Sequence, residues 1–120
     1  MTILVNTSTR TVLHFDANGS VVVVGNNTVS NLTSTSTETV KKSRISQVWF
    51  GSDAGSWQVT QGNSTVNSVA GVFSGTGHMP FHQSGVVLDV NPTGESLYAT
   101  LDGAANGFIM IELHKKSAVA

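Results

Sequence analysis

His78 and His82 are the pair of side chains whose spacing comes nearest to a metal site. Four residues apart, they would share one face of a helix, a spacing found in many zinc-binding pairs. Pro80 lies between them and excludes that helix. No cysteine or carboxylate nearby completes a ligand set. We therefore expect no metal here and interpret the segment as a polar loop or an edge strand.

Carboxylates and hydroxyls are numerous but form no recognisable catalytic pattern. The seven carboxylates are scattered, and no two are placed in the sequence like an acid–base pair. No nucleophile-elbow motif surrounds a serine, and the glycines of 75–77 lack the context of a phosphate-binding loop. Residues 16–19 resemble the start of a calcium loop but lack the distal glutamate, so a turn explains them. We expect neither enzymatic activity nor a cofactor.

The composition favours a single domain with few charged residues. Its 120 residues are enough for one domain with a genuine core. Charged residues make up only 11%, against about 25% on average, and the formal net charge is -1. Because nucleic-acid binding needs a concentrated basic surface, we expect no nucleic-acid partner. Low charge opposes self-association only weakly, which suits a subunit of an assembly.

The sequence also indicates where the protein is made. It contains no cysteine, which removes disulfides and thiol chemistry. The start of the chain, MTILVNTSTR, lacks the basic region and long apolar run of a signal peptide. The longest clean apolar run, residues 21–24, is far short of the roughly 20 residues of a membrane-spanning helix. We expect a protein made in the cytoplasm with no membrane contact.

The central stretch 45–61, ISQVWFGSDAGSWQVTQ, predicts two short strands joined by a glycine-bounded loop over 51–55. We interpret it as a hairpin. Strict alternation would place Ile45 and Trp49 on one face of the first strand, with Phe50 on the opposite face. One of these two aromatics must then look outward. We expect Trp57 to lie in the core, packed with Val59.

The rest of the chain has the same strand rhythm. A second hairpin is predicted over 11–24, with its turn at 16–19, and further alternating segments follow up to 108–114, where Ile109, Ile111 and Leu113 face inward. No window shows a helical period. Roughly eight strands at 8 to 12-residue spacing predict a single antiparallel β-sandwich of the jelly-roll type without a substantial helix.

Two segments are candidates for contact arms. Residues 1–9 begin with a short apolar stretch that predicts a strand or an N-terminal arm. Residues 25–39 are polar and rich in threonine, and only Val29 and Leu32 are large and apolar. They predict either a long loop of functional importance or a weak edge strand.

Four segments carry a resemblance to a known family: 44–50, RISQVWF; 56–59, SWQV; 75–81, GTGHMPF; and 108–116, FIMIELHKK. In this order they resemble small β-sandwich proteins encoded among the structural genes of tailed bacteriophages. The resemblance implies a non-catalytic virion component, a capsid decoration or cement protein. It would be a homo-oligomer that binds the major capsid protein or other virion subunits.

For such a role we expect the contact surface to include apolar side chains of the central strand, the long loop and the proline-containing segment. These interface candidates are Trp49, Phe50, Val29, Leu32 and Phe81. Two alternatives remain open at this point. One is a carbohydrate-binding or receptor-binding module in which an exposed aromatic stacks on a sugar. The other is a tail or neck subunit that closes into a ring.

Overall fold

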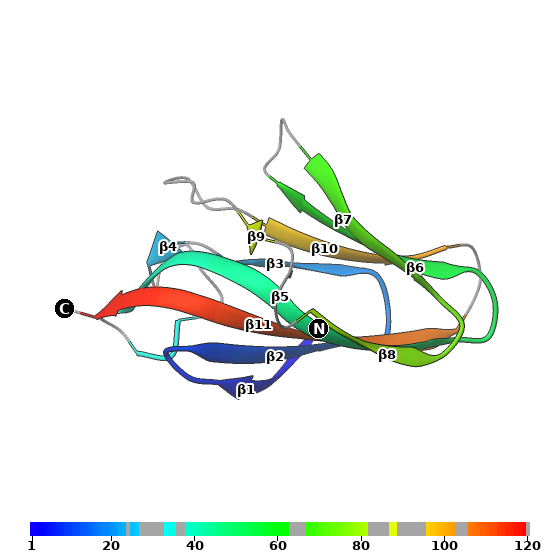
Figure 1. The fold of residues 1–120 in the computed structure, drawn as a ribbon, viewed down its shortest axis with the longest axis horizontal. Coiled ribbons are helices and arrows are strands. Elements are labelled where there is room, and N and C mark those ends of the chain that lie inside the picture. Colours follow the sequence, from blue (N-terminus) through cyan, green and yellow to red (C-terminus); the bar gives the residue numbers. More distant parts are fainter. Residues whose placement is uncertain are drawn as a thin grey trace.

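The fold is all-β. The computed structural model describes residues 1–23, 25–26, 33–35, 38–62, 67–81, 87–88, 96–102 and 106–119. Within these residues every regular element is a strand, and the strands form two antiparallel sheets that lie face to face (Figure 1). The predicted all-β sandwich without a substantial helix is thereby confirmed. The finer jelly-roll topology stays a prediction.

The larger sheet has seven strands. Its main order is β1 (Thr2–Asn6), β2 (Arg10–Phe15), β11 (Gly107–Val119), β5 (Glu38–Ser52) and β4 (Gly25–Asn26), and β8 (Gly77–Pro80) and β9 (Val87–Leu88) also pair with β5. The longest strand pair of the sheet is β5 with β11, which runs from Gly107 opposite Ser52 to Val119 opposite Glu38. Of the alternatives for residues 1–9, the strand is realised, because β1 pairs with β2.

The smaller sheet has four strands in the order β3 (Gly19–Val22), β10 (Ser96–Leu101), β6 (Ser56–Gly62) and β7 (Asn67–Ser74). The described residues thus contain eleven strands where the sequence predicted about eight. The difference comes from short pieces that pair with β5. One of them, β4, occupies the start of the polar stretch 25–39, which is in part an edge strand.

The core lies between the two sheets. Its largest fully buried side chain is Trp57, as predicted, and Val59 beside it is equally buried. The Trp57 ring also donates from Nε1 to the carbonyl oxygen of Gly51 at 3.3 Å, so its polar atom is satisfied. Burying a large apolar side chain contributes about 1.5–3 kcal/mol, and these residues therefore carry much of the stability. The inward positions Ile109, Ile111 and Leu113 are confirmed.

The two predicted hairpins are wrong. β5 and β6 belong to different sheets, and so do β2 and β3, so each tight loop carries the chain across the core instead of folding it back within one sheet. The physical reason is that both strands of each pair have an apolar face, and the fold buries these faces against each other. Side chains of the two loops bond to the backbone of neighbouring segments: Asn18 Oδ1 accepts from Leu101 N, at the end of β10, at 2.7 Å, and Asp53 Oδ1 accepts from Asn106 N at 2.8 Å.

The predicted alternation along β5 is also wrong at one point. Gln47 lies opposite Glu112, but the next partner of β11, Leu113, lies opposite Ile45. Ser46 is therefore the extra residue of a β-bulge, which reverses the faces of the strand. Ile45 turns into the core although strict alternation placed it with Trp49.

A second register shift follows further back along β5. Lys116 lies opposite Lys42, while Ser117 lies opposite Val40, so Lys41 is the extra residue. This shift turns Val40 and Glu38 inward, and both are buried. One strand thus changes its inward face twice, and the second change brings a carboxylate into the interior.

Candidate functional site

A row of side chains crosses the face of the larger sheet that is turned away from the core, called the outer face below. Register places His14 opposite Met110, Met110 opposite Trp49, and Trp49 opposite His78. The row therefore runs over β2, β11, β5 and β8. Cross-strand neighbours of this kind stand close enough for their side chains to interact.

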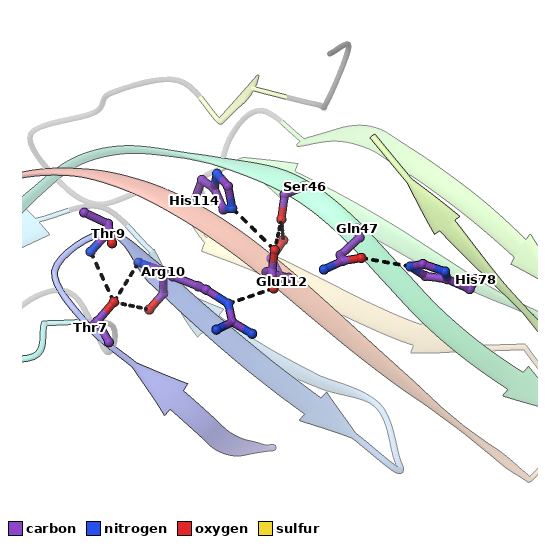
Figure 2. A network of polar contacts seen from close by, with 8 residues as sticks. All are labelled: Thr7, Thr9, Arg10, Ser46, Gln47, His78, Glu112 and His114. Carbon is purple, nitrogen blue, oxygen red and sulfur yellow. Dashed lines mark hydrogen bonds and ion pairs between the residues drawn. The ribbon is translucent and has the colours of Figure 1, made fainter. Parts of the chain in front are cut away.

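The Trp49 indole is held by its neighbours in this row. Its ring lies parallel to that of His78, with 5.1 Å between ring centroids and 7° between the planes. His78 Nε2 also lies 2.9 Å from Gln47 Oε1 (Figure 2). One face of the indole is therefore covered by an imidazole, and the ring stays half-buried.

A second aromatic pair extends the row toward the start of β11. Phe108 stacks on His14, with 6.3 Å between ring centroids and 19° between the planes. The same phenyl ring lies over Gly51, where an added Cβ would come within 2.8 Å of Phe108 Cε1. Only glycine leaves room for the ring, which remains 36% exposed. This end of the outer face is therefore apolar and open to solvent.

A buried carboxylate lies beside the aromatic row. Glu112 accepts a hydrogen bond from Arg10 Nε at 2.8 Å and one from Ser46 Oγ at 2.7 Å, and His114 Nε2 lies 3.4 Å away (Figure 2). The bulge in β5 is what brings the Ser46 hydroxyl to this position. The side chain of Glu112 is 6% exposed, whereas that of Arg10 is 48% exposed. The guanidinium is therefore in contact with solvent, while the carboxylate is buried.

The protonation of Glu112 follows from these contacts. Burial by itself would raise the pKa of Glu112, but the hydrogen bonds from Ser46 and Arg10 outweigh it and lower the pKa below its usual value. The carboxylate is therefore charged at neutral pH and keeps Arg10 in place. The turn before β2 also fixes Arg10, because Thr7 Oγ1 accepts from Arg10 N at 3.1 Å.

The interface candidates fall into three groups. Trp49 lies on the outer face, and its interface role stays a prediction. Phe50 is directed into the core, where its ring lies 5.2 Å from that of Phe73, so of the two opposed aromatics Trp49 is the outward one. Phe81 is half-buried against the core. Val29 and Leu32 lie outside the described residues.

Sequence reasoning missed most of the outer face. Alternation along 108–114 does place Glu112 and His114 outward. Their contact with Arg10 depends on the pairing of β11 with β2, which bridges 102 positions in the sequence and has no local signal. The Ser46 contact requires the bulge, which alternation cannot show.

The described residues contain no group of three or more histidine or acidic side chains arranged to hold a metal. In the same part of the chain, no helix has the length and apolar character to cross a membrane. Comparisons with models of protein families, with curated protein sequences and with solved structures found no match. Chemically, the outer face presents aromatic and thioether side chains beside an exposed guanidinium.

Proposed function

We propose that this protein is a non-catalytic virion structural protein of a tailed phage, a capsid decoration or cement protein. In this proposal the outer face of the larger sheet binds neighbouring capsid subunits. The observation that carries it is the gathering of Arg10, Trp49, Phe108 and Met110 on one sheet face. The phage assignment itself is supported by the sequence resemblance of 44–50 and 108–116.

The residue types on the outer face suit a protein partner. Aromatic residues, methionine and arginine are enriched at protein–protein interfaces, and tryptophan and arginine are the commonest hot spots. A sugar-binding site would instead need an open aromatic ring face for stacking. Because His78 covers one face of Trp49 at 5.1 Å between centroids, the indole is less suited to that use. The geometry therefore favours adhesion to protein over the carbohydrate-binding alternative.

Binding to empty capsid shells tests the proposal. We expect Trp49→Ala to weaken binding by about 2 kcal/mol, or roughly 30-fold, while circular dichroism shows an unchanged fold. Gln58→Ala, at an exposed position of the smaller sheet, is the matched control and should bind like the unmodified protein. Equal binding by both variants would remove the outer face from the proposal.

Three further measurements address the assignment as a whole. Mass spectrometry of purified virions should detect the protein, and its absence would contradict the virion role. A saturable change in tryptophan fluorescence with glycans, without binding to capsid shells, would support the carbohydrate-binding alternative. Light scattering coupled to size exclusion would identify a ring expected of a tail or neck subunit.

A further inference from the structure

A second polar cluster lies on the core side of the larger sheet. It is at the end of the sheet where β5 begins and β11 ends, and Figure 1 shows how these two strands run. Lys115 on β11 continues the inward series of Leu113, and the second shift in β5 turns Glu38 inward. Lys115 Nζ lies 3.3 Å from Glu38 Oε2, and both side chains are 0% exposed. The pair is therefore removed from water, and solvent cannot replace either partner of the ion pair.

Asn6, the last residue of β1, places its carboxamide against this pair. Lys115 Nζ donates to Asn6 Oδ1 at 2.8 Å, and Thr11 Oγ1 donates to the same oxygen at 2.9 Å. Asn6 Nδ2 donates to the carbonyl oxygen of Thr33 at 3.2 Å. The carboxamide is thus fixed in orientation, and two donors polarise its carbonyl.

Glu38 is held just as firmly. Its Oε1 accepts from Ser34 N at 2.6 Å and from Ser34 Oγ at 2.7 Å, which leaves Oε2 directed at the lysine amine. The carboxylate is therefore placed to take a proton from Lys115 with little movement. An amine, a carboxamide and a carboxylate from three different strands meet at one point, where the amine and the carboxylate are fully buried and the carboxamide is half-buried.

We propose that Lys115 and Asn6 react to form an intramolecular isopeptide bond, with Glu38 as the proton carrier. This proposal stands independently of the function proposed above. A carbonyl bond is about 1.23 Å long, so the Asn6 Cγ lies within about 4 Å of Lys115 Nζ. Reaction geometries have about 3–3.5 Å between the reacting atoms, so a small shift of the side chains is enough.

The steps balance with these residues alone. Glu38 takes a proton from the Lys115 ammonium, and the neutral Nζ attacks Asn6 Cγ. The hydrogen bond from Thr11 Oγ1 stabilises the oxyanion that forms. Glu38 then delivers its proton to Asn6 Nδ2, and the bond from Cγ to Nδ2 breaks to release ammonia. The attacking Nζ loses its remaining extra proton, which the ammonia takes up to become ammonium. The products are one secondary amide and one ammonium ion, with Glu38 again a carboxylate.

The surroundings favour the nucleophilic form of the lysine. Burial lowers the pKa of Lys115, although Glu38 opposes the change. A desolvated amine with a lowered pKa is the activated form of lysine in covalent chemistry.

The mass of the intact folded protein is the first test. We expect it to be one ammonia lighter than the mass of the chain. Trypsin should then release the peptide ending at Arg10 joined to the peptide from Ile45 to Lys116, with no cleavage after Lys115. This map separates the link from loss of ammonia elsewhere. Folded protein with the full mass, or with Asn6 merely hydrolysed to aspartate, would overturn the proposal.

Variants test the role of Glu38. Because general acid–base catalysis contributes about 10²–10⁴-fold, Glu38→Gln should slow linkage by that factor and leave unlinked chain at full mass. Asn6→Ala should give no link at all. Glu112→Gln changes the other buried glutamate of the sheet and should still lose one ammonia. A link that forms equally fast in Glu38→Gln would overturn the assignment of Glu38.

Discussion

Glu112 and Glu38 are two buried carboxylates that form ion pairs on neighbouring strands of the larger sheet, but on opposite sides of it. Glu112 faces outward and pairs with Arg10, which is 48% exposed. Glu38 faces inward and pairs with Lys115, and neither side chain is exposed. The side of the sheet on which a carboxylate lies decides whether water can replace the cation that pairs with it. Solvent can take the place of Arg10 beside Glu112, whereas no solvent reaches the side chains of Glu38 and Lys115.

This difference predicts unequal costs for removing the cation. Exposed ion pairs contribute about 0.2–1 kcal/mol, because solvent screens the charges and takes over their hydration. Removing one member of a buried pair costs about 3–5 kcal/mol, because the other charge stays buried without its partner. Four predictions follow this difference from the largest effect to the smallest.

Lys115→Met should have the largest effect. Compared within the Asn6→Ala background, in which the proposed link cannot form and Lys115 keeps its charge, it leaves the Glu38 carboxylate buried without its cation, so we expect the free energy of unfolding to fall by about 3–5 kcal/mol. Urea unfolding measures this change. Lys41→Met, on an exposed position of the same sheet, should stay within about 0.5 kcal/mol of the unmodified protein. A loss no larger than that of the control would mean that the interior pair contributes nothing to stability.

Ser46→Ala should have an intermediate effect. The Ser46 hydroxyl donates to a charged carboxylate from a buried position, and its removal should cost about 1.5–3 kcal/mol. Ser52→Ala provides the matched control, because Ser52 Oγ makes only an exposed contact of 3.4 Å with Gly55 O. Equal unfolding midpoints for both variants would show that the bulge does not need its hydroxyl contact.

Arg10→Ala should be milder. Because Arg10 is half-exposed and Glu112 keeps its bond from Ser46, we expect a loss of about 0.2–1 kcal/mol. The loss should shrink as salt is added, since screening already weakens an exposed pair. Urea midpoints at low and high ionic strength measure it. A loss as large as that of Lys115→Met would abolish the distinction between the two sides of the sheet.

Glu112→Gln should have the smallest effect, a change in how the free energy of unfolding depends on pH in the acid range. The folded-state pKa of Glu112 lies below its usual value of 4.5, so its stabilising contribution is complete above that value. It is lost as the pH falls through the folded-state pKa, because the unfolded chain binds the proton more readily. We expect a shallower decline between neutral and acid pH in Glu112→Gln. Identical profiles would exclude a contribution from Glu112.

The sequence predicted what is local and missed what depends on pairing. Strand content, the absence of a substantial helix and the burial of Trp57 follow from residue types and period, and all are confirmed for the residues that the structure describes. Whether two consecutive strands share a sheet is not a local property, and both predicted hairpins cross the core instead. A bulge moves one residue out of register, so alternation could not place Ile45 correctly.

The two clusters illustrate the same limit. Lys115 and Asn6 are separated by 109 positions, and Arg10 and Glu112 by 102. No spacing rule connects residues so far apart. Their meeting depends on β11 pairing with β2 on one side and β5 on the other, and on two bulges that set which residues of β5 face inward.

The crossing connections have a consequence for how the chain folds. Because β2, β5 and β10 are each followed by a strand of the opposite sheet, neither sheet can be completed from one continuous stretch of chain. Contacts between distant segments must form before either layer is stable, and all-β domains dominated by such contacts fold in milliseconds to seconds. We expect unfolding in a single cooperative transition, with both layers lost together.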